Sequence, residues 1–155
     1  MTKKILTLCL VHKHPHVLLG MKKRGFGMGK WNGFGGKVQP EETIELAAIR
    51  EVKEEANIDI DIMEKVGVIN FNWENNPETL EVHLFRAENF RGQPVESEEM
   101  MPQWYHVDEI PFNDMWPDDA HWMPLLFAGK KFQGKFLFDN KNNIIQHELN
   151  EVIEV

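Results

Sequence analysis

Three glutamates with helical spacing are the residues of this chain best suited to chemistry. Glu51, Glu54 and Glu55 stand three and four positions apart, and at about 100° per residue an α-helix places them on one narrow face. Ala48 and Val52 fall on the adjoining arc, which would pack on a core. Carboxylates at this spacing repel one another, whereas a cluster of hard oxygen ligands suits Mg²⁺ or Mn²⁺. The pattern predicts a metal site, and its alternative is a solvated acidic helix face.

A glycine-rich segment runs directly into this helix and favours the metal site. Residues 31–38 read Trp-Asn-Gly-Phe-Gly-Gly-Lys-Val. Three glycines within four positions let the backbone come close to a ligand or adopt positive φ. Arg50 and Lys53 could neutralise part of the carboxylate charge by pairing along the helix. A simple structural turn would not need this many glycines beside a carboxylate cluster.

Six residues of this region stand at the spacing of the Nudix box, the signature of hydrolases that cleave nucleoside diphosphates linked to another group. The chain therefore resembles the Nudix family. The resemblance extends over essentially the whole sequence, because residues 20–27, 31–38, 94–100 and 115–119 are similar to the animal Nudix enzymes that act on oxidised purine nucleoside triphosphates, the counterparts of bacterial 8-oxo-dGTP diphosphatases. The box residues are Gly36, Glu42, Arg50, Glu51, Glu54 and Glu55.

The fold implied by the resemblance is an α+β, Nudix-type α/β/α sandwich with a mixed β-sheet and two main helices, in a single domain over residues 1–155. Hydrophobic periodicity and turn residues are consistent with it. Thr43 is the predicted N-cap of a helix that runs to about Ala56. A second helix is predicted over residues 118–128, and strands over 5–12, 17–22, 59–73, 80–90, 101–107, 132–138 and 144–152.

Composition narrows the class of protein. A length of 155 residues suits one domain with a real core. The net charge of −8 argues against a nucleic-acid polymer as partner but is compatible with a small nucleotide. Cys9 is the only cysteine, so no internal disulfide can form and a reducing compartment is expected. No stretch reaches membrane-spanning length. We expect a monomer in the cytoplasm, with the nucleus or mitochondria as further locations.

The resemblance implies a divalent cation, Mg²⁺ with Mn²⁺ as an alternative, that neutralises the substrate phosphates. Arg50 and Glu42 are expected to orient the glutamates, and the general base is left open between Glu55 and Glu54. The implied products are a nucleoside monophosphate and pyrophosphate. The expected metal ligands are Glu51, Glu54, Glu55, Glu99 and a backbone carbonyl of Gly35 or Gly36.

Base recognition is predicted at the segment Trp116-Pro117-Asp118-Asp119. Two aspartates could instead cap the following helix, with the proline in its first turn. In the resembling enzymes the pair faces the purine edge, the tryptophan packs on the purine face, and Asn32 completes the polar contacts. Two close carboxylates in a dry pocket cannot both ionise cheaply, so one should stay protonated. Such a pair can donate or accept a hydrogen bond, which would explain activity on nucleotides of both oxidised guanine and oxidised adenine.

The resemblance also suggests further substrate contacts. On the sequence alone, Phe71 and Trp73 alternate as strand residues and could equally be packed in the core. The additional expected contacts are Thr7, Lys22, Phe26, Phe34, Gly35, Gly36, Lys37, Phe71 and Trp73.

Three positions depart from the family pattern, and one of them is Pro40, which stands where a glycine is usual. Asn57 stands where a glycine is usual, just after the carboxylate helix, and we expect it to adopt the left-handed conformation that closes the helix. Leu6 replaces a tyrosine near the expected base pocket and bears on fine substrate preference.

Two other functions are compatible with the sequence: a Nudix activity on ADP-ribose, dinucleoside polyphosphates or methylated purine triphosphates, and a non-catalytic nucleotide-binding module.

Overall fold

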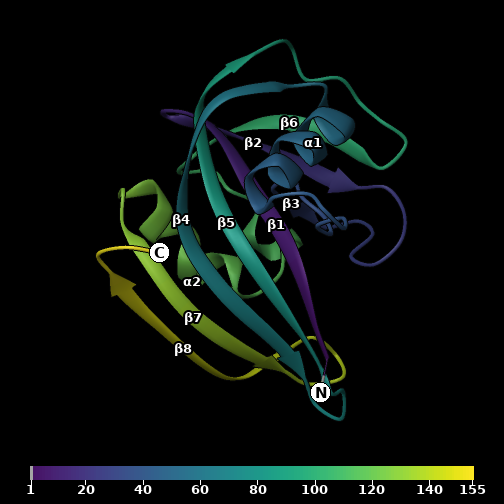
Figure 1. The fold of residues 1–155 in the computed structure, drawn as a ribbon, viewed down its shortest axis with the longest axis vertical. Helices are drawn as coiled ribbons and strands as arrows, with labels where there is room; N and C mark the ends of the chain where they lie inside the picture. The colour runs from purple at the N-terminus through teal and green to yellow at the C-terminus, as the bar shows by residue number, and fades with distance from the viewer. Residues whose placement is uncertain (1) are drawn as a thin grey trace.

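The computed structural model describes residues 2–155, which form one mixed sheet with a helix on each side (Figure 1). Within these residues no helix is both long and apolar enough to cross a membrane. The strands are β1 (Thr2–Lys13), β2 (His16–Lys22), β3 (Trp31–Asn32), β4 (Asp59–Trp73), β5 (Glu78–Arg91), β6 (Met100–His106), β7 (Lys131–Phe138) and β8 (Ile144–Val152). The helices are α1 (Ile44–Ala56), α2 (Asp119–Phe127) and a 3₁₀ turn, η1 (Phe112–Asp114).

The strands follow the order β3-β2-β1-β5-β4-β7-β8, and β6 pairs with β2. β1 pairs with β5 in parallel, as β4 does with β7, and the other ladders are antiparallel. The mixed sheet implied by the resemblance is therefore confirmed. The long β1–β5–β4 ladders bring segments distant in sequence into one continuous surface.

Each face of the sheet has its own hydrophobic core. On one face α1 packs Ala48 and Val52 against Cys9 and Phe85. On the other face Trp122 of α2 packs within a cluster to which β1, β2, β4, β5 and β7 all contribute. Figure 1 shows α1 and α2 on opposite sides of the sheet. The α/β/α sandwich follows from strands whose alternate side chains are apolar on both faces.

The carboxylate helix begins and ends as its sequence predicts. The Thr43 side chain accepts a hydrogen bond from the Leu46 amide at 3.1 Å, which satisfies one of the free N–H groups of the first turn. Asn57 has φ 61° and ψ 32°, and its amide donates to the Lys53 carbonyl at 3.0 Å. The expected left-handed residue at the end of this helix is thus confirmed.

The other predicted elements lie within a few residues of their observed bounds, and the 3₁₀ turn η1 and one strand were not predicted. The strand expected to begin at residue 5 begins at Thr2, and the helix expected from residue 118 begins at Asp119. The missed strand is β3, which contains only Trp31 and Asn32. Two residues are too few to show an alternating pattern, so only pairing with β2 reveals this strand.

Candidate active site

The glycine-rich segment lies alongside β1 and brings the backbone against the carboxylate helix. The Thr7 amide donates to the Gly36 carbonyl at 2.9 Å. A Cβ added at Gly35 would lie 1.8 Å from the Thr7 carbonyl oxygen, and one added at Gly36 would lie 2.7 Å from the Glu51 carboxylate. Gly35 is therefore required by its close approach to the neighbouring strand, whereas a side chain at Gly36 would displace the carboxylate of a candidate metal ligand.

Arg50 organises the acidic face of α1. Its guanidinium donates to Glu42 at 2.6 and 3.0 Å, to Glu51 at 2.9 Å and to Glu54 at 3.2 Å. A further bond reaches the Lys37 carbonyl at 3.2 Å. The hydrogen bond from Arg50 lowers the pKa of the Glu42 carboxyl, and the same contact raises the pKa of Arg50. These contacts agree with an orienting role for Arg50, which does not line the pocket described below.

Glu55 differs from its neighbours because it is buried. It is 5% exposed and lines the pocket, and its Oε1 accepts a hydrogen bond from the Gly35 amide at 2.9 Å. Burial raises its pKa to about 8, with the charges of Glu51 and Glu99 adding to the rise and the Gly35 hydrogen bond and Lys22 opposing it. Glu54, in contrast, has a side chain 59% exposed to solvent. Burial thus separates the two candidates for the general base.

Glu99 is distinguished from the other glutamates of its loop by its position. Glu96 forms an ion pair with Lys23, whereas the charge of Glu99 raises the pKa of both Glu51 and Glu55. For Glu51, burial is the larger cause and the like charges of Glu54 and Glu99 add to it. Glu99 therefore faces the carboxylates of α1 across the site.

The oxygen donors at this site fit a hard divalent cation. Within residues 2–155, no three acidic, His or Cys side chains already converge on a common point, since Arg50 and Arg24 hold Glu51 and Glu99 in ion pairs. The Gly35 amide faces Glu55, and in extended backbone the carbonyl of the same residue points to the same side. The Gly36 carbonyl is instead bonded to β1. Of the two predicted carbonyls, that of Gly35 is therefore the better candidate for a metal ligand.

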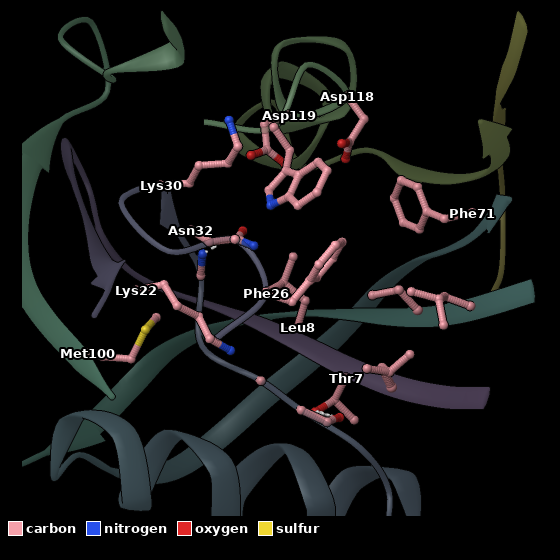
Figure 2. Close-up of a pocket in the computed structure, with 18 of the residues that line it drawn as sticks. Thr7, Leu8, Lys22, Phe26, Lys30, Asn32, Phe71, Met100, Asp118 and Asp119 are labelled. Atoms are coloured by element: carbon pink, nitrogen blue, oxygen red, sulfur yellow. Dashed lines mark hydrogen bonds between the residues drawn. The ribbon is translucent and has the colours of Figure 1, made fainter. Parts of the chain in front are cut away.

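A mainly apolar pocket opens between β1, β4 and β5, the loop after β2, and the start of α2. In Figure 2, Asp118 and Asp119 lie at one end of this pocket and Thr7 lies at the other end, beside α1. Aromatic rings form part of its wall: Phe26 lies 5.1 Å from Trp116 and 6.1 Å from Trp73, measured between ring centroids. A pocket with apolar walls and a few polar groups is typical of a small-molecule site.

Asp118 and Asp119 are buried acidic groups at the end of this pocket opposite Glu55, at 4% and 2% exposure. Asp118 Oδ2 accepts a hydrogen bond from Trp122 Nε1 at 2.8 Å and its side chain makes no capping bond, so the helix-cap alternative is wrong for this residue. Asp119 Oδ2 has no hydrogen-bond partner among residues 2–155. Burial raises the pKa of both carboxyls, and the charge of Asp118 raises that of Asp119 further. The pair favours holding one proton.

The structure brings most of the predicted substrate residues together. Those that line the pocket are Thr7, Lys22, Phe26, Asn32, Gly35, Gly36, Phe71, Trp73, Trp116, Asp118 and Asp119.

Three predicted contacts lie elsewhere. Phe34 is fully buried in the core with α1, because its side chain points from the glycine-rich segment to the opposite side. Lys37 is exposed, and its backbone bonds to Arg50 and pairs with Leu6. Pro117 lies in the turn before α2, outside the pocket lining. Successive side chains of an extended segment point to opposite sides, so the sequence neighbours of a site residue do not all reach the site.

Several residues that line the pocket were not predicted from the sequence. Leu80 and Val82 are two positions apart on β5 and so share a face of the sheet, and Leu80 pairs with Phe71. Their period-two spacing is the sequence signal that could have placed them beside Phe71. The Lys30 Nζ lies 5.5 Å from the centroid of the Trp116 ring. Leu6, one of the positions that depart from the family pattern, also lines the pocket. The other missed residues are Leu8, Gly27, Gly33, Met100 and Phe138.

Comparisons with known proteins agree with this geometry. The family model described as the NUDIX domain matches residues 4–126. The chain is 54% identical to the oxidised purine nucleoside triphosphate hydrolase of Danio rerio and 53% identical to that of Mus musculus, in each case over 97% of both chains. Among solved structures, the MutT protein of Bacillus halodurans superposes with a TM-score of 0.84 at 24% identity, over 95% of this chain and 97% of that one. By its family model, its relatives and its fold, this chain belongs to the Nudix family of hydrolases.

Proposed function

We propose that this protein hydrolyses oxidised purine nucleoside triphosphates to nucleoside monophosphates and pyrophosphate. The observation that carries the proposal is a buried carboxyl pair, Asp118 and Asp119, in an apolar pocket whose opposite end reaches Glu55. The Danio rerio and Mus musculus proteins, which share more than half of their residues with this chain, bear the name of that activity. One pocket thus offers a recognition end and a reactive end.

Recognition rests on a carboxyl pair that holds one proton. A protonated carboxyl donates a hydrogen bond and an ionised one accepts, so the pair can meet a purine edge that presents one of each. Asn32 adds an amide that can donate and accept on the same wall, although its Oδ1 already accepts from the Gly33 amide at 2.9 Å. Oxidation adds polar groups to a purine edge. A dry site built for such groups discriminates against bases that leave its own polar groups unpaired.

Glu55 is the proposed general base. A water oxygen forms a bond to phosphorus, the phosphoanhydride bond between the α- and β-phosphates breaks to give the monophosphate and pyrophosphate, and the water proton passes to the Glu55 carboxylate. The Gly35 amide orients this carboxylate, and Lys22 favours its charged form. Arg50 holds Glu51 in place beside it. Glu54, more exposed and paired with Arg50, has the lesser role.

Nudix hydrolases generally require divalent cations, and Mg²⁺, replaceable by Mn²⁺, is the ion we propose here. Glu51, Glu55, Glu99 and the Gly35 carbonyl would hold it. Bound there, the ion would neutralise phosphate charge, polarise the reacting phosphoryl group and favour the ionised form of Glu55. We further propose that the protein acts as a monomer on free nucleotides, in the cytoplasm or wherever else nucleotide pools are maintained.

Product analysis with three nucleotides tests the proposal. The purified protein is incubated with 8-oxo-dGTP, dGTP or ADP-ribose, each in the presence of Mg²⁺ or of EDTA, and the products are separated by anion exchange. We expect Mg²⁺-dependent release of monophosphate and pyrophosphate, with the highest kcat/KM for the oxidised nucleotide. Preferred cleavage of ADP-ribose would assign another Nudix activity. Binding of a nucleotide without metal-dependent turnover would indicate a non-catalytic module.

A further inference from the structure

Two loops that belong to opposite ends of the site are joined directly. The first connects β2 to β3 and carries Phe26, which is 66% exposed at the pocket and packs on Trp116. The second precedes β6 and carries Glu99. Both loops leave the same β2–β6 ladder, whose last pair is Lys22 with Met100. Their connection lies just beyond that pair, at residues 23–24.

Lys23 makes three contacts with the second loop. Its amide donates to the Glu99 carbonyl at 2.8 Å. Its Nζ donates to the Ser97 carbonyl at 3.0 Å and forms an ion pair with Glu96. Bonds from an ammonium group are stronger than those between neutral groups. Lys23 therefore fixes the backbone on both sides of Glu98, including that of Glu99 itself.

The adjacent Arg24 adds a weaker connection. Its guanidinium lies 3.6 Å from carboxylate oxygens of both Glu98 and Glu99, and all three side chains are largely exposed. Ion pairs of this kind contribute little and exchange readily. The Glu99 side chain can therefore leave Arg24 for another cation, whereas its backbone stays bonded to Lys23.

The conformation of the Phe26 loop depends on the residues at which it leaves the sheet. Gly25, Gly27 and Gly29 all have φ between 79° and 86°, and a Cβ added at Gly25 or Gly29 would meet nothing within 4 Å. The loop is closed at its base by bonds between Lys22 and residues 29 and 30. Within the loop, the Met28 amide donates to the Gly25 carbonyl at 3.1 Å and the Lys30 amide donates to the Gly27 carbonyl at 3.0 Å. Residues 25–30 are therefore hydrogen-bonded to one another, so a shift at residues 23–24 moves them together with Phe26.

We propose that Lys23 is a positioning residue that couples the Glu99 loop to the Phe26 loop, so that cation binding at the carboxylates and purine binding in the pocket assist each other. This inference rests on the proposed function, because it assigns Glu99 to the cation. A cation that orders Glu99 also orders the backbone held by Lys23, and hence the start of the Phe26 loop. By linkage, a bound purine strengthens cation binding by the same factor.

Hydrogen exchange with Mg²⁺ alone tests the coupling without turnover. In the wild-type full chain, we expect Mg²⁺ to slow amide exchange in residues 96–100 and also in residues 24–30. In Lys23→Met, which keeps an apolar stem but loses the Nζ contacts, we expect the first response to remain and the second to fall. Lys23→Arg should restore it. Arg91→Gln, which removes an exposed ion pair with Asp61 on β4, is the matched control and should behave as wild type.

Equilibrium binding gives the second measurement. We expect the Kd of an oxidised purine nucleoside, which carries no phosphate for the cation to bind directly, to fall about 5-fold when Mg²⁺ is present in the wild type, and this factor to approach 1 in Lys23→Met. The melting temperature of each variant verifies that it is folded. Equal coupling in Lys23→Met and the wild type would overturn the proposal. So would a wild type whose residues 96–100 ignore Mg²⁺, and the product assay would then decide separately whether the proposed activity survives.

Discussion

The two acidic sites of this molecule use carboxylates in opposite ways. On α1, Glu51 is partly buried and Glu54 is exposed, and Arg50 balances part of the charge of both. At the start of α2, Asp118 and Asp119 lie in a dry pocket where no such ion pair is found within residues 2–155. The charge of Glu51 and Glu54 is therefore balanced by Arg50, whereas the charge of Asp118 and Asp119 is reduced by retaining a proton. The first arrangement suits a reaction on phosphates and the second suits reading a base.

The strongest test of this contrast is Glu55→Gln. The amide oxygen can still accept from the Gly35 amide, but the side chain can no longer take a proton from water. We expect kcat to fall about 10²–10⁴-fold with little change in KM. The measurement is steady-state kinetics on 8-oxo-dGTP at saturating Mg²⁺. Glu54→Gln is the control and should lose much less; a larger loss in that variant would move the general base to Glu54.

The second test addresses the recognition end through Asp119→Asn. An asparagine cannot switch between donor and acceptor by titration, so one of the two purine-edge patterns is lost. We expect kcat/KM to fall about 10–100-fold for at least one oxidised purine. Kinetics on 8-oxo-dGTP, 2-hydroxy-dATP and dGTP measure it, with the exposed Asp108→Asn as control. An unchanged kcat/KM for every purine would show that the pair does not read the base.

Stability against pH tests whether Glu55 differs from the exposed glutamates. Its folded pKa of about 8 lies above the unfolded value of 4.5. The folded state therefore binds more protons between these values, so this contribution to stability is complete below pH 4.5 and is lost as pH rises through about 8. In EDTA, we expect Glu55→Gln to be more stable than wild type by about 1–4 kcal/mol at pH 9 and no more stable at pH 4.

Denaturant unfolding at the two pH values measures this difference. Glu54→Gln, at an exposed position, should not show the same pH-dependent gain. Equal pH dependence in wild type and Glu55→Gln would mean that Glu55 is not buried as described. Addition of Mg²⁺ should reduce the gain of Glu55→Gln, because the ion stabilises the wild-type carboxylate.

The smallest expected effect concerns the backbone beneath the carboxylates. Asn57 closes α1 with φ 61°, a conformation that costs an alanine about 1 kcal/mol. We expect Asn57→Ala to lower the free energy of unfolding by about this amount and Asn57→Gly to change it by less than about 0.5 kcal/mol. Both should retain kcat. A loss of kcat in Asn57→Gly would show that the asparagine side chain contributes to the site.

Local features of the chain were predictable because their causes are local. The Thr43 cap, the helix to Ala56 and the left-handed Asn57 all depend on neighbours within one or two turns. Features that depend on the direction of a side chain or a carbonyl were not predictable. Phe34 was expected in the pocket and lies in the core, and the Gly36 carbonyl faces β1. A change of one position along an extended segment reverses the direction of both side chain and carbonyl.

The sequence by itself determined the acidic cluster and its glycine-rich approach. Glu51, Glu54 and Glu55 share a helix face whatever the rest of the chain does, because their spacing matches the helical repeat. Only the tertiary structure decided that Glu55 is the buried member, that the Gly35 amide bonds to it, and that Asp119 lies dry at the far end of the same pocket. Burial and convergence arise when distant strands pair, and the spacing of residues along the chain does not encode that pairing.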